Sequence, residues 1–280
     1  MKYNLELLCN IKNVLGEGPY YDYRNNDISF IDIVGKKLHI IDNKKNIKSI
    51  DFNERIGAAI PTNDNSYMIC AESALYIYKD GNINKCKSLE SIMDKGMRCN
   101  DAKADSMGRL WFSTMMDDGV SKPKSGLYTI INDEIVLKDS DIKLGNGLAC
   151  SADDKKLYYA DSIERKVYVY DFDLAKGDIS NRRILFNVDG IPDGMTIDNS
   201  GNLFVCIWGG SRIEIRSSID GELIDTISMP TKLVTSCTFS GNNFDELIIT
   251  TAKLDETDEY AGCVFKLKLD YKGRKEYFLK

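Results

Sequence analysis

The stretch that decides the fold runs from Gly190 to Val205 and reads GIPDGMTIDNSGNLFV. It places one carboxylate, Asp193, between a proline and a glycine, near the start of a short apolar run. A turn of sequence Asp-Asn-Ser-Gly follows at residues 198–201, with side chains that can bond their own backbone and a glycine suited to positive φ. The stretch therefore predicts two short strands joined by a tight turn, with Asp193 near the beginning of the first.

The same turn and strand recur six times along the 280 residues. The turns begin at Asp22, Thr62, Asp105, Ser151, Asp198 and Gly241. Each unit continues into an alternating strand, whose matching apolar positions are Leu38, Leu75, Leu127, Val167, Ile213 and Val264. The repeat of about 45 residues fits the four strands of one propeller blade. We predict an all-β, six-bladed β-propeller in one domain, residues 1–280, with residues 3–8 completing the last blade. A pair of β-sandwiches, the competing interpretation, would not produce six equal units.

Composition excludes several classes of protein. The net charge is −6 with both signs mixed and no basic stripe, so nucleic acid is not an expected partner. No apolar run approaches the roughly 18 residues of a membrane span, and the first residues lack a signal-peptide pattern. The sequence predicts a soluble, cytoplasmic protein that does not bind membranes. Its eight cysteines form no Cys-x-x-Cys pair and are predicted to be buried, reduced thiols rather than a metal site.

One position in each repeat is predicted to face the central channel. Counting back five residues from each turn reaches Glu17, Gly57, Asn100, Asn146, Asp193 and Ser236. Two carboxylates and two carboxamides would thus converge on one axis. Because unpaired buried carboxylates are costly, a cation is expected there, and an all-oxygen set suits Ca²⁺ or Mg²⁺, with Mn²⁺ or Zn²⁺ as alternatives. The competing interpretation is that each side chain caps a strand end by local hydrogen bonds.

Other polar residues extend this predicted site. Arg98 lies two residues before Asn100, so it points the same way on a strand, and its guanidinium can donate paired hydrogen bonds to a polyol or carboxylate. A surface salt bridge is the alternative for Arg98. Asp118 lies in a loop that could reach the same mouth. The single histidine, His39, is predicted to be a half-exposed sheet residue far from the axis, which leaves a carboxylate or a metal-bound hydroxide as the base.

Eight segments together resemble the regucalcin family, which includes senescence marker protein, gluconolactonase and luciferin-regenerating enzyme. They are LGEGP at 15–19, FIDI at 30–33, RCND at 98–101, GRLWF at 108–112, NGL at 146–148, IPDGM at 191–195, WGG at 208–210 and TSC at 235–237. The likeness covers the whole chain and implies a six-bladed propeller with one divalent cation, Ca²⁺ foremost, in its channel. It also implies Glu17, Asn146 and Asp193 as metal ligands, and Arg98, Asn100 and Asp118 as substrate-binding residues.

The function implied by this resemblance is metal-dependent hydrolysis of small sugar lactones, as in gluconolactonase. The cation would polarise the lactone carbonyl, Asp193 would take a proton from the attacking water, and Arg98, Asn100 and Asp118 would hold ring hydroxyls. Two alternatives stay open: a non-catalytic propeller that binds Ca²⁺ or a metabolite, and a metal-dependent hydrolase of other esters or organophosphates.

Overall fold

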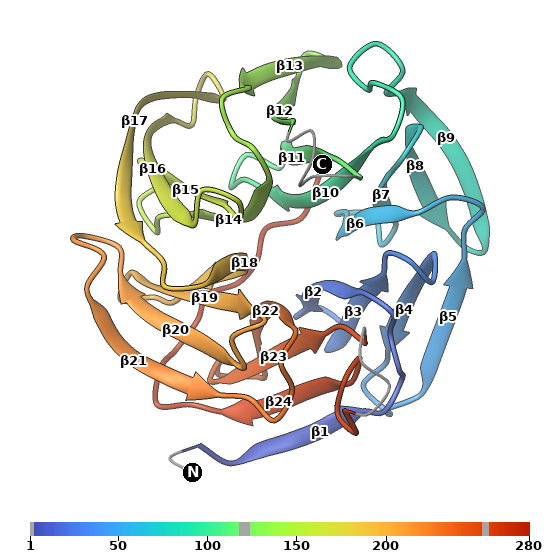
Figure 1. Ribbon diagram of the computed structural model, residues 1–280. Helices are drawn as coiled ribbons and strands as arrows, with labels where there is room; N and C mark the ends of the chain where they lie inside the picture. Colours follow the sequence, from blue (N-terminus) through green and yellow to red (C-terminus); the bar gives the residue numbers. More distant parts are fainter. Residues whose placement is uncertain (1–2, 118–123, 254–257) are drawn as a thin grey trace.

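Six four-stranded antiparallel sheets surround a central axis in the computed structural model, which describes residues 3–117, 124–253 and 258–280 (Figure 1). The predicted six-bladed β-propeller is confirmed. The described ranges contain no helix, and therefore none long and apolar enough to cross a membrane.

The strands of each blade are ordered from the axis outward. The innermost strands are β2 (Gly16–Asp22), β6 (Ile56–Pro61), β10 (Met97–Ala104), β14 (Gly145–Cys150), β18 (Ile191–Ile197) and β22 (Val234–Ser240). The second strands are β3 (Asp27–Asp32), β7 (Tyr67–Ala71), β11 (Leu110–Met116), β15 (Lys156–Asp161), β19 (Asn202–Trp208) and β23 (Glu246–Thr251). The third strands are β4 (Lys37–Ile41), β8 (Ala74–Lys79), β12 (Ser125–Ile131), β16 (Lys166–Asp173), β20 (Arg212–Ser217) and β24 (Val264–Lys268). The outer strands are β5 (Ile47–Asp51), β9 (Asn82–Ser88), β13 (Glu134–Asp139), β17 (Asp178–Asn187), β21 (Leu223–Ser228) and β1 (Leu5–Cys9).

Burial falls from the axis to the rim. Every residue of β6, β14 and β22 is buried, whereas β5 is largely exposed. The second strands are also covered on both faces by neighbouring blades, so they carry apolar runs such as Phe204, Val205 and Cys206 of β19, which are fully buried. The outer strands instead carry many charged residues, which discourage pairing of the free sheet edges with other chains.

The turn at residues 198–201 has the geometry that its sequence predicts. One carboxylate oxygen of Asp198 accepts the backbone N–H groups of Ser200 at 2.8 Å and Asn202 at 2.7 Å. Gly201 has a φ of 86°, which a residue with a Cβ adopts only at a cost. This turn reverses the chain from β18 into β19 and so begins the fifth blade.

The first strand of the chain closes the ring. β1 pairs with β24 in antiparallel register, with Leu5 opposite Leu267, and so supplies the outer strand of the sixth blade (Figure 1). This agrees with the prediction for residues 3–8. The closure joins segments from opposite ends of the sequence, which ties the first blade to the last.

The last ten residues run across one end of the channel. Leu279 forms a bridge with Thr62, and Gly273 forms one with Asp198, so the tail spans from the fifth blade to the second. Glu276 makes an ion pair with Lys103 of β10 at 2.8 Å. These contacts lie where the inner strands end, whereas the predicted site residues lie where those strands begin. The tail therefore covers the end of the channel opposite the predicted site.

Two expectations about individual side chains need correction. His39, predicted to be half-exposed, is only 3% exposed, because its ring packs at a tilt against Phe30 with centroids 5.0 Å apart and its Nδ1 lies 2.8 Å from Ser49 Oγ. Cys86 is exposed, while the other seven cysteines are buried, and none of the eight forms a disulfide.

Candidate active site

A β-bulge interrupts each inner strand at the same level. In β2 the register passes from Glu17 opposite Ile31 to Tyr20 opposite Ser29, and the other five inner strands show matching shifts. Extra residues in a bulge bend the strand and redirect side chains. Gly18 and Gly147 take positive φ values of 51° and 45° there, which explains the glycines that flank the predicted axial residues.

A cavity of about 430 Å³ opens at this level of the channel. Its polar lining consists of Glu17, Arg98, Asn100, Asn146, Ser162, Arg165 and Asp193. Its apolar lining consists of Leu15, Ile33, Met115, Leu144, Ile163, Ile191 and Trp208. The structure thus brings together five of the six residues predicted for the site. The sixth, Asp118, lies outside the described residues.

The two remaining axial positions do not line this cavity. A Cβ at Gly57 would lie 2.2 Å from the carbonyl oxygen of Cys99, so β6 and β10 approach too closely for a side chain. Ser236 faces Gly194, where a Cβ would lie 2.2 Å from the serine Oγ. Both positions therefore serve the packing of adjacent inner strands.

A chain of hydrogen bonds crosses the cavity wall from the third blade to the fifth. Arg98 Nη1 donates to Asn100 Oδ1 at 2.7 Å, and Asn100 Nδ2 donates to Asn146 Oδ1 at 2.9 Å. Asn146 Nδ2 donates to Ser162 Oγ at 3.0 Å, and Ser162 Oγ donates to the carbonyl oxygen of Pro192 at 2.7 Å. Because Asn146 Oδ1 accepts a hydrogen bond from Asn100 while Asn146 Nδ2 donates one to Ser162, the orientation of the Asn146 amide is fixed.

The carboxylates of the cavity lack a sufficient counter-charge from the protein. Burial raises the pKa of Glu17 well above its usual range, and Asp193 and Asp101 raise it further. Burial likewise raises the pKa of Asp193 well above its usual range, with Asp101 adding to the effect and Arg98 partly opposing it. Two acidic groups that the protein leaves undercompensated are suited to a cation.

Arg98 is buried and shares its positive charge among several partners. Burial lowers its pKa, while Asp117 opposes that change. Its Nε lies 3.5 Å from Asp117, which is also bound by Arg55 at 2.6 Å. The guanidinium therefore enters the cavity in a fixed position. The alternative interpretation of Arg98 as a surface salt bridge does not fit its exposure of 7%.

The three side chains that could bind a cation offer the oxygen ligands that suit a hard divalent ion, but they are few. Glu17 and Asp193 offer carboxylate oxygens and Asn146 an amide oxygen, the ligands that Ca²⁺ and Mg²⁺ prefer. Among the residues with described positions, no three or more His, Cys, Asp or Glu side chains gather as a metal site. A cation at the axis would thus need the asparagine oxygen and water to complete its shell.

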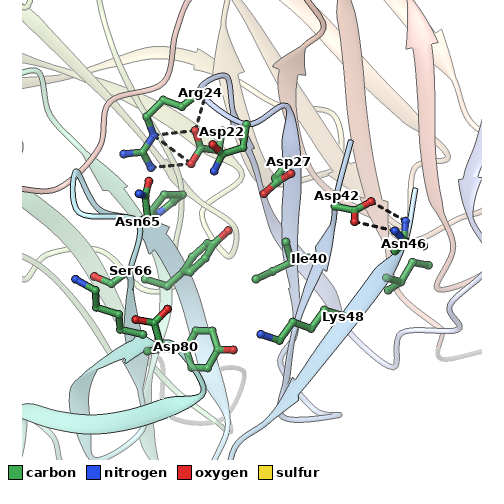
Figure 2. Close-up of a pocket in the computed structure, with 16 residues that line it drawn as sticks. Asp22, Arg24, Asp27, Ile40, Asp42, Asn46, Lys48, Asn65, Ser66 and Asp80 are labelled. Carbon is green, nitrogen blue, oxygen red and sulfur yellow. Dashed lines mark hydrogen bonds and ion pairs between the residues drawn. The ribbon is translucent and has the colours of Figure 1, made fainter. Parts of the chain in front are cut away.

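Figure 2 shows a second pocket, of about 370 Å³, between the first and second blades. Asp22 accepts the Nε and Nη2 groups of Arg24 at 2.9 and 2.6 Å, and Asp42 accepts Asn46 Nδ2 at 2.8 Å. Asp22 and Asp42 thus have side-chain partners within the pocket, whereas the carboxylate of Glu17 accepts the backbone N–H of Gly18 at 3.0 Å. The axial cavity is therefore the better candidate for chemistry.

Comparisons with known proteins agree with the geometry. The family model for the SMP-30/gluconolactonase/LRE-like region matches residues 15–253. The chain therefore belongs to the SMP-30/gluconolactonase/LRE-like family. Among its relatives, "Putative sugar lactone lactonase YvrE" of Bacillus subtilis is 34% identical over 280 residues, covering 95% of both chains. Regucalcin of Danio rerio is 31% identical over 287 residues, covering 98% of this chain and 97% of that protein. A solved luciferin-regenerating enzyme superposes with a TM-score of 0.93 at 33% identity, covering 99% of both chains.

Three polar residues near the axis were not predicted from the sequence. Asp101 occupies the same bulge as Asn100, and burial raises its pKa, but its spacing is off by one from the axial positions. Ser162 and Arg165 follow β15 and reach the cavity from a hairpin rather than from an inner strand. A count restricted to inner strands could not find them.

Proposed function

We propose that this protein is a divalent-cation-dependent lactonase that opens sugar lactones. One observation carries the proposal: Glu17, Asn146 and Asp193 line a single cavity together with Arg98 and Asn100. Membership of a family whose name includes gluconolactonase, and similarity to a protein named as a sugar lactone lactonase, support it.

In this proposal, Glu17, Asn146 and Asp193 hold the cation, with Ca²⁺ foremost. When bound, the cation supplies Lewis-acid polarisation of the lactone carbonyl and stabilises the charge that develops on its oxygen. The hydrogen bond from Asn146 Nδ2 to Ser162 Oγ turns the amide so that its oxygen, not its nitrogen, is available to a cation. Ser162 is thus a positioning residue for Asn146.

The remaining steps fall to side chains of this chain. Asp193 takes a proton from the attacking water, for which its position in the cavity is suitable. Arg98 and Asn100 bind ring hydroxyls and orient the ester carbon. Asp118 completes the substrate-binding set by resemblance to the family. The apolar part of the lining limits water around the reacting groups, which strengthens their electrostatic interactions.

Cation binding without catalysis is the second candidate. The chain has relatives named regucalcin, and the three proposed ligands would suffice to hold a cation without any further residue. Arg98 favours hydrolysis, since a buried guanidinium beside the donor set has no role in holding a cation.

A panel of aldonolactones, assayed by acid release before and after EDTA treatment, tests the proposal. We expect hydrolysis to disappear with EDTA and to return when Ca²⁺, Mg²⁺, Mn²⁺ or Zn²⁺ is added back. Activity that survives complete metal removal would refute cation dependence. Metal binding without hydrolysis of any lactone would favour the second candidate.

A further inference from the structure

Arg165 is the only cationic side chain besides Arg98 among the described residues that line the axial cavity. It lies at the tip of the hairpin between β15 and β16, where it is exposed. Unlike Arg98, its guanidinium makes no hydrogen bond or ion pair with any residue in the described ranges. A guanidinium that faces a cavity and keeps its donors free is suited to a planar anion such as a carboxylate or phosphate.

The backbone of the hairpin that carries Arg165 is held in place by the side chain of Asp161. The buried carboxylate of Asp161 accepts the backbone N–H groups of Ile163 and Glu164, both at 3.0 Å. It also accepts the N–H of Lys143 at 2.8 Å, which joins the hairpin to the segment before β14. The backbone of the tip is therefore pre-organised, so ligand binding would order only the side chain of Arg165.

The charge around this tip is positive. The hairpin carries two carboxylates, and neither pairs with Arg165. Asp161 accepts the backbone N–H groups of the turn, and Glu164 is bound by Lys166 at 3.0 Å and also by Lys143. Against these two acids the described part of the tip has three cationic side chains, those of Lys143, Arg165 and Lys166. An anionic group that reached the rim would meet a net positive field.

The first blade provides an internal comparison. Lys36 occupies the same hairpin position as Arg165, one residue before the strand that pairs with β3 or β15, and the φ values are 56° and 55°. Lys36 is also exposed, but it donates to the carbonyl oxygen of Asn53 at 3.1 Å and does not line the cavity. The hairpin position alone therefore does not create a cavity-lining cation.

We propose that the lactone opened by this protein carries a distal anionic group, a carboxylate or a phosphate, and that Arg165 binds this group at the rim. The inference rests on the proposed lactonase function and narrows its substrate class to acidic sugar lactones. Arg165 acts as a specificity-determining residue: it pairs with the substituent while the ester faces the opposite, acidic part of the cavity.

The test compares matched neutral and anionic lactones. One pair is glucono-δ-lactone and its 6-phosphate, and the other is glucono-γ-lactone and glucaro-γ-lactone, so that phosphate and carboxylate are distinguished. We expect the anionic member of at least one pair to have a kcat/KM about tenfold higher, mainly through a lower KM, as one charge-assisted pair would supply. In Arg165→Gln this preference should vanish while the neutral lactones change less than about twofold. Arg165→Lys should keep part of it, and Lys36→Gln should behave as wild type.

The dependence on ionic strength and the binding of reaction products provide two independent tests of whether Arg165 binds an anionic group. Added salt should raise KM for the anionic lactone only, because the rim is exposed. By calorimetry, 6-phosphogluconate or glucarate should bind wild type more tightly than gluconate, and Arg165→Gln should lose the difference. Equal kcat/KM within both pairs, or equal losses for neutral and anionic lactones in Arg165→Gln, would overturn the inference and leave the lactonase proposal intact. If no lactone is opened, the lactonase proposal fails, and the calorimetric comparison alone decides whether Arg165 binds anions.

Discussion

Asp193 illustrates how the site trades stability for function at the scale of a single residue. The residue is 6% exposed and lies next to other acids, and burial raises the pKa of its carboxyl group well above the usual range. For a carboxyl group, a folded-state pKa above the unfolded value means that stability is present at low pH and is lost as pH rises through the folded pKa. Without a cation, ionised Asp193 therefore destabilises the protein at neutral pH.

We expect Asp193→Asn to raise the free energy of unfolding of the metal-free protein at pH 7, because it removes this charge. The same change should reduce the rise in Tm caused by Ca²⁺ and lower lactone hydrolysis by about 100-fold or more, since the base is lost. Thermal melts with EDTA and with added cation, together with kcat, provide the measurement. Glu17→Gln is the matched comparison. Like Asp193→Asn, it should raise the Tm measured with EDTA and reduce the rise in Tm caused by the cation. A destabilised metal-free Asp193→Asn protein would contradict the assignment.

At the scale of single elements, the pairing of β3 with β4 makes the stability of the protein depend on pH. It buries His39 against Phe30, and burial lowers the pKa of the imidazole below its usual value of about 6.5. The unfolded chain then binds a proton that the folded chain does not. Stability from this pair is full above about pH 6.5 and is lost as pH falls toward the folded pKa.

We therefore expect wild type to lose more stability than His39→Gln between about pH 7 and pH 5. Urea unfolding at several pH values measures this, and the difference between the two proteins isolates His39 from the axial acids. Lactone hydrolysis should keep the same pH profile in both proteins, because His39 does not line the cavity. Parallel stability curves would show that burial does not perturb this histidine.

The whole molecule is held together by two closures, the β1–β24 pairing and the tail across the channel. Burial alone would raise the pKa of Glu276, but Lys103 and then Arg274 outweigh it and lower that pKa. The tail also buries Phe278 and Leu279 against inner strands of the second and third blades. We propose that these closures make residues 1–280 one domain that unfolds in a single transition.

Glu276→Ala should lower the free energy of unfolding by about 2–3 kcal/mol, somewhat less than the loss of one partner in a fully buried pair. Lys79→Ala is the control, since its ion pair with Asp64 has a similar length of 2.7 Å but is exposed, and it should change stability little. Chemical denaturation followed by both tryptophan fluorescence and circular dichroism measures the effect. Equal losses in the two variants, or separate transitions for the two probes, would contradict this account of the tail.

The sequence by itself determined the blade and its count. A turn such as Asp198–Gly201 and period-2 apolar strands are local signals, and their recurrence about every 45 residues is enough to predict six four-stranded units. It also predicted that Glu17, Asn146 and Asp193 share one cavity, because they hold equivalent positions in a repeated unit. Their roles as ligands and base stay predictions.

Only the tertiary structure decided the features that depend on contacts between strands, hairpins and the C-terminal tail. The burial of His39, the ion pair of Glu276 and the bond from Asn146 to Ser162 join segments whose spacing in the sequence has no regular pattern. Arg165 and Lys36 make the same point, since they hold equivalent places in two hairpins but only Arg165 lines the cavity. The physical reason is that strand periodicity is set by bonds and dihedrals between near neighbours. The partners of a hairpin or tail are instead set by how the closed ring packs six separate sheets.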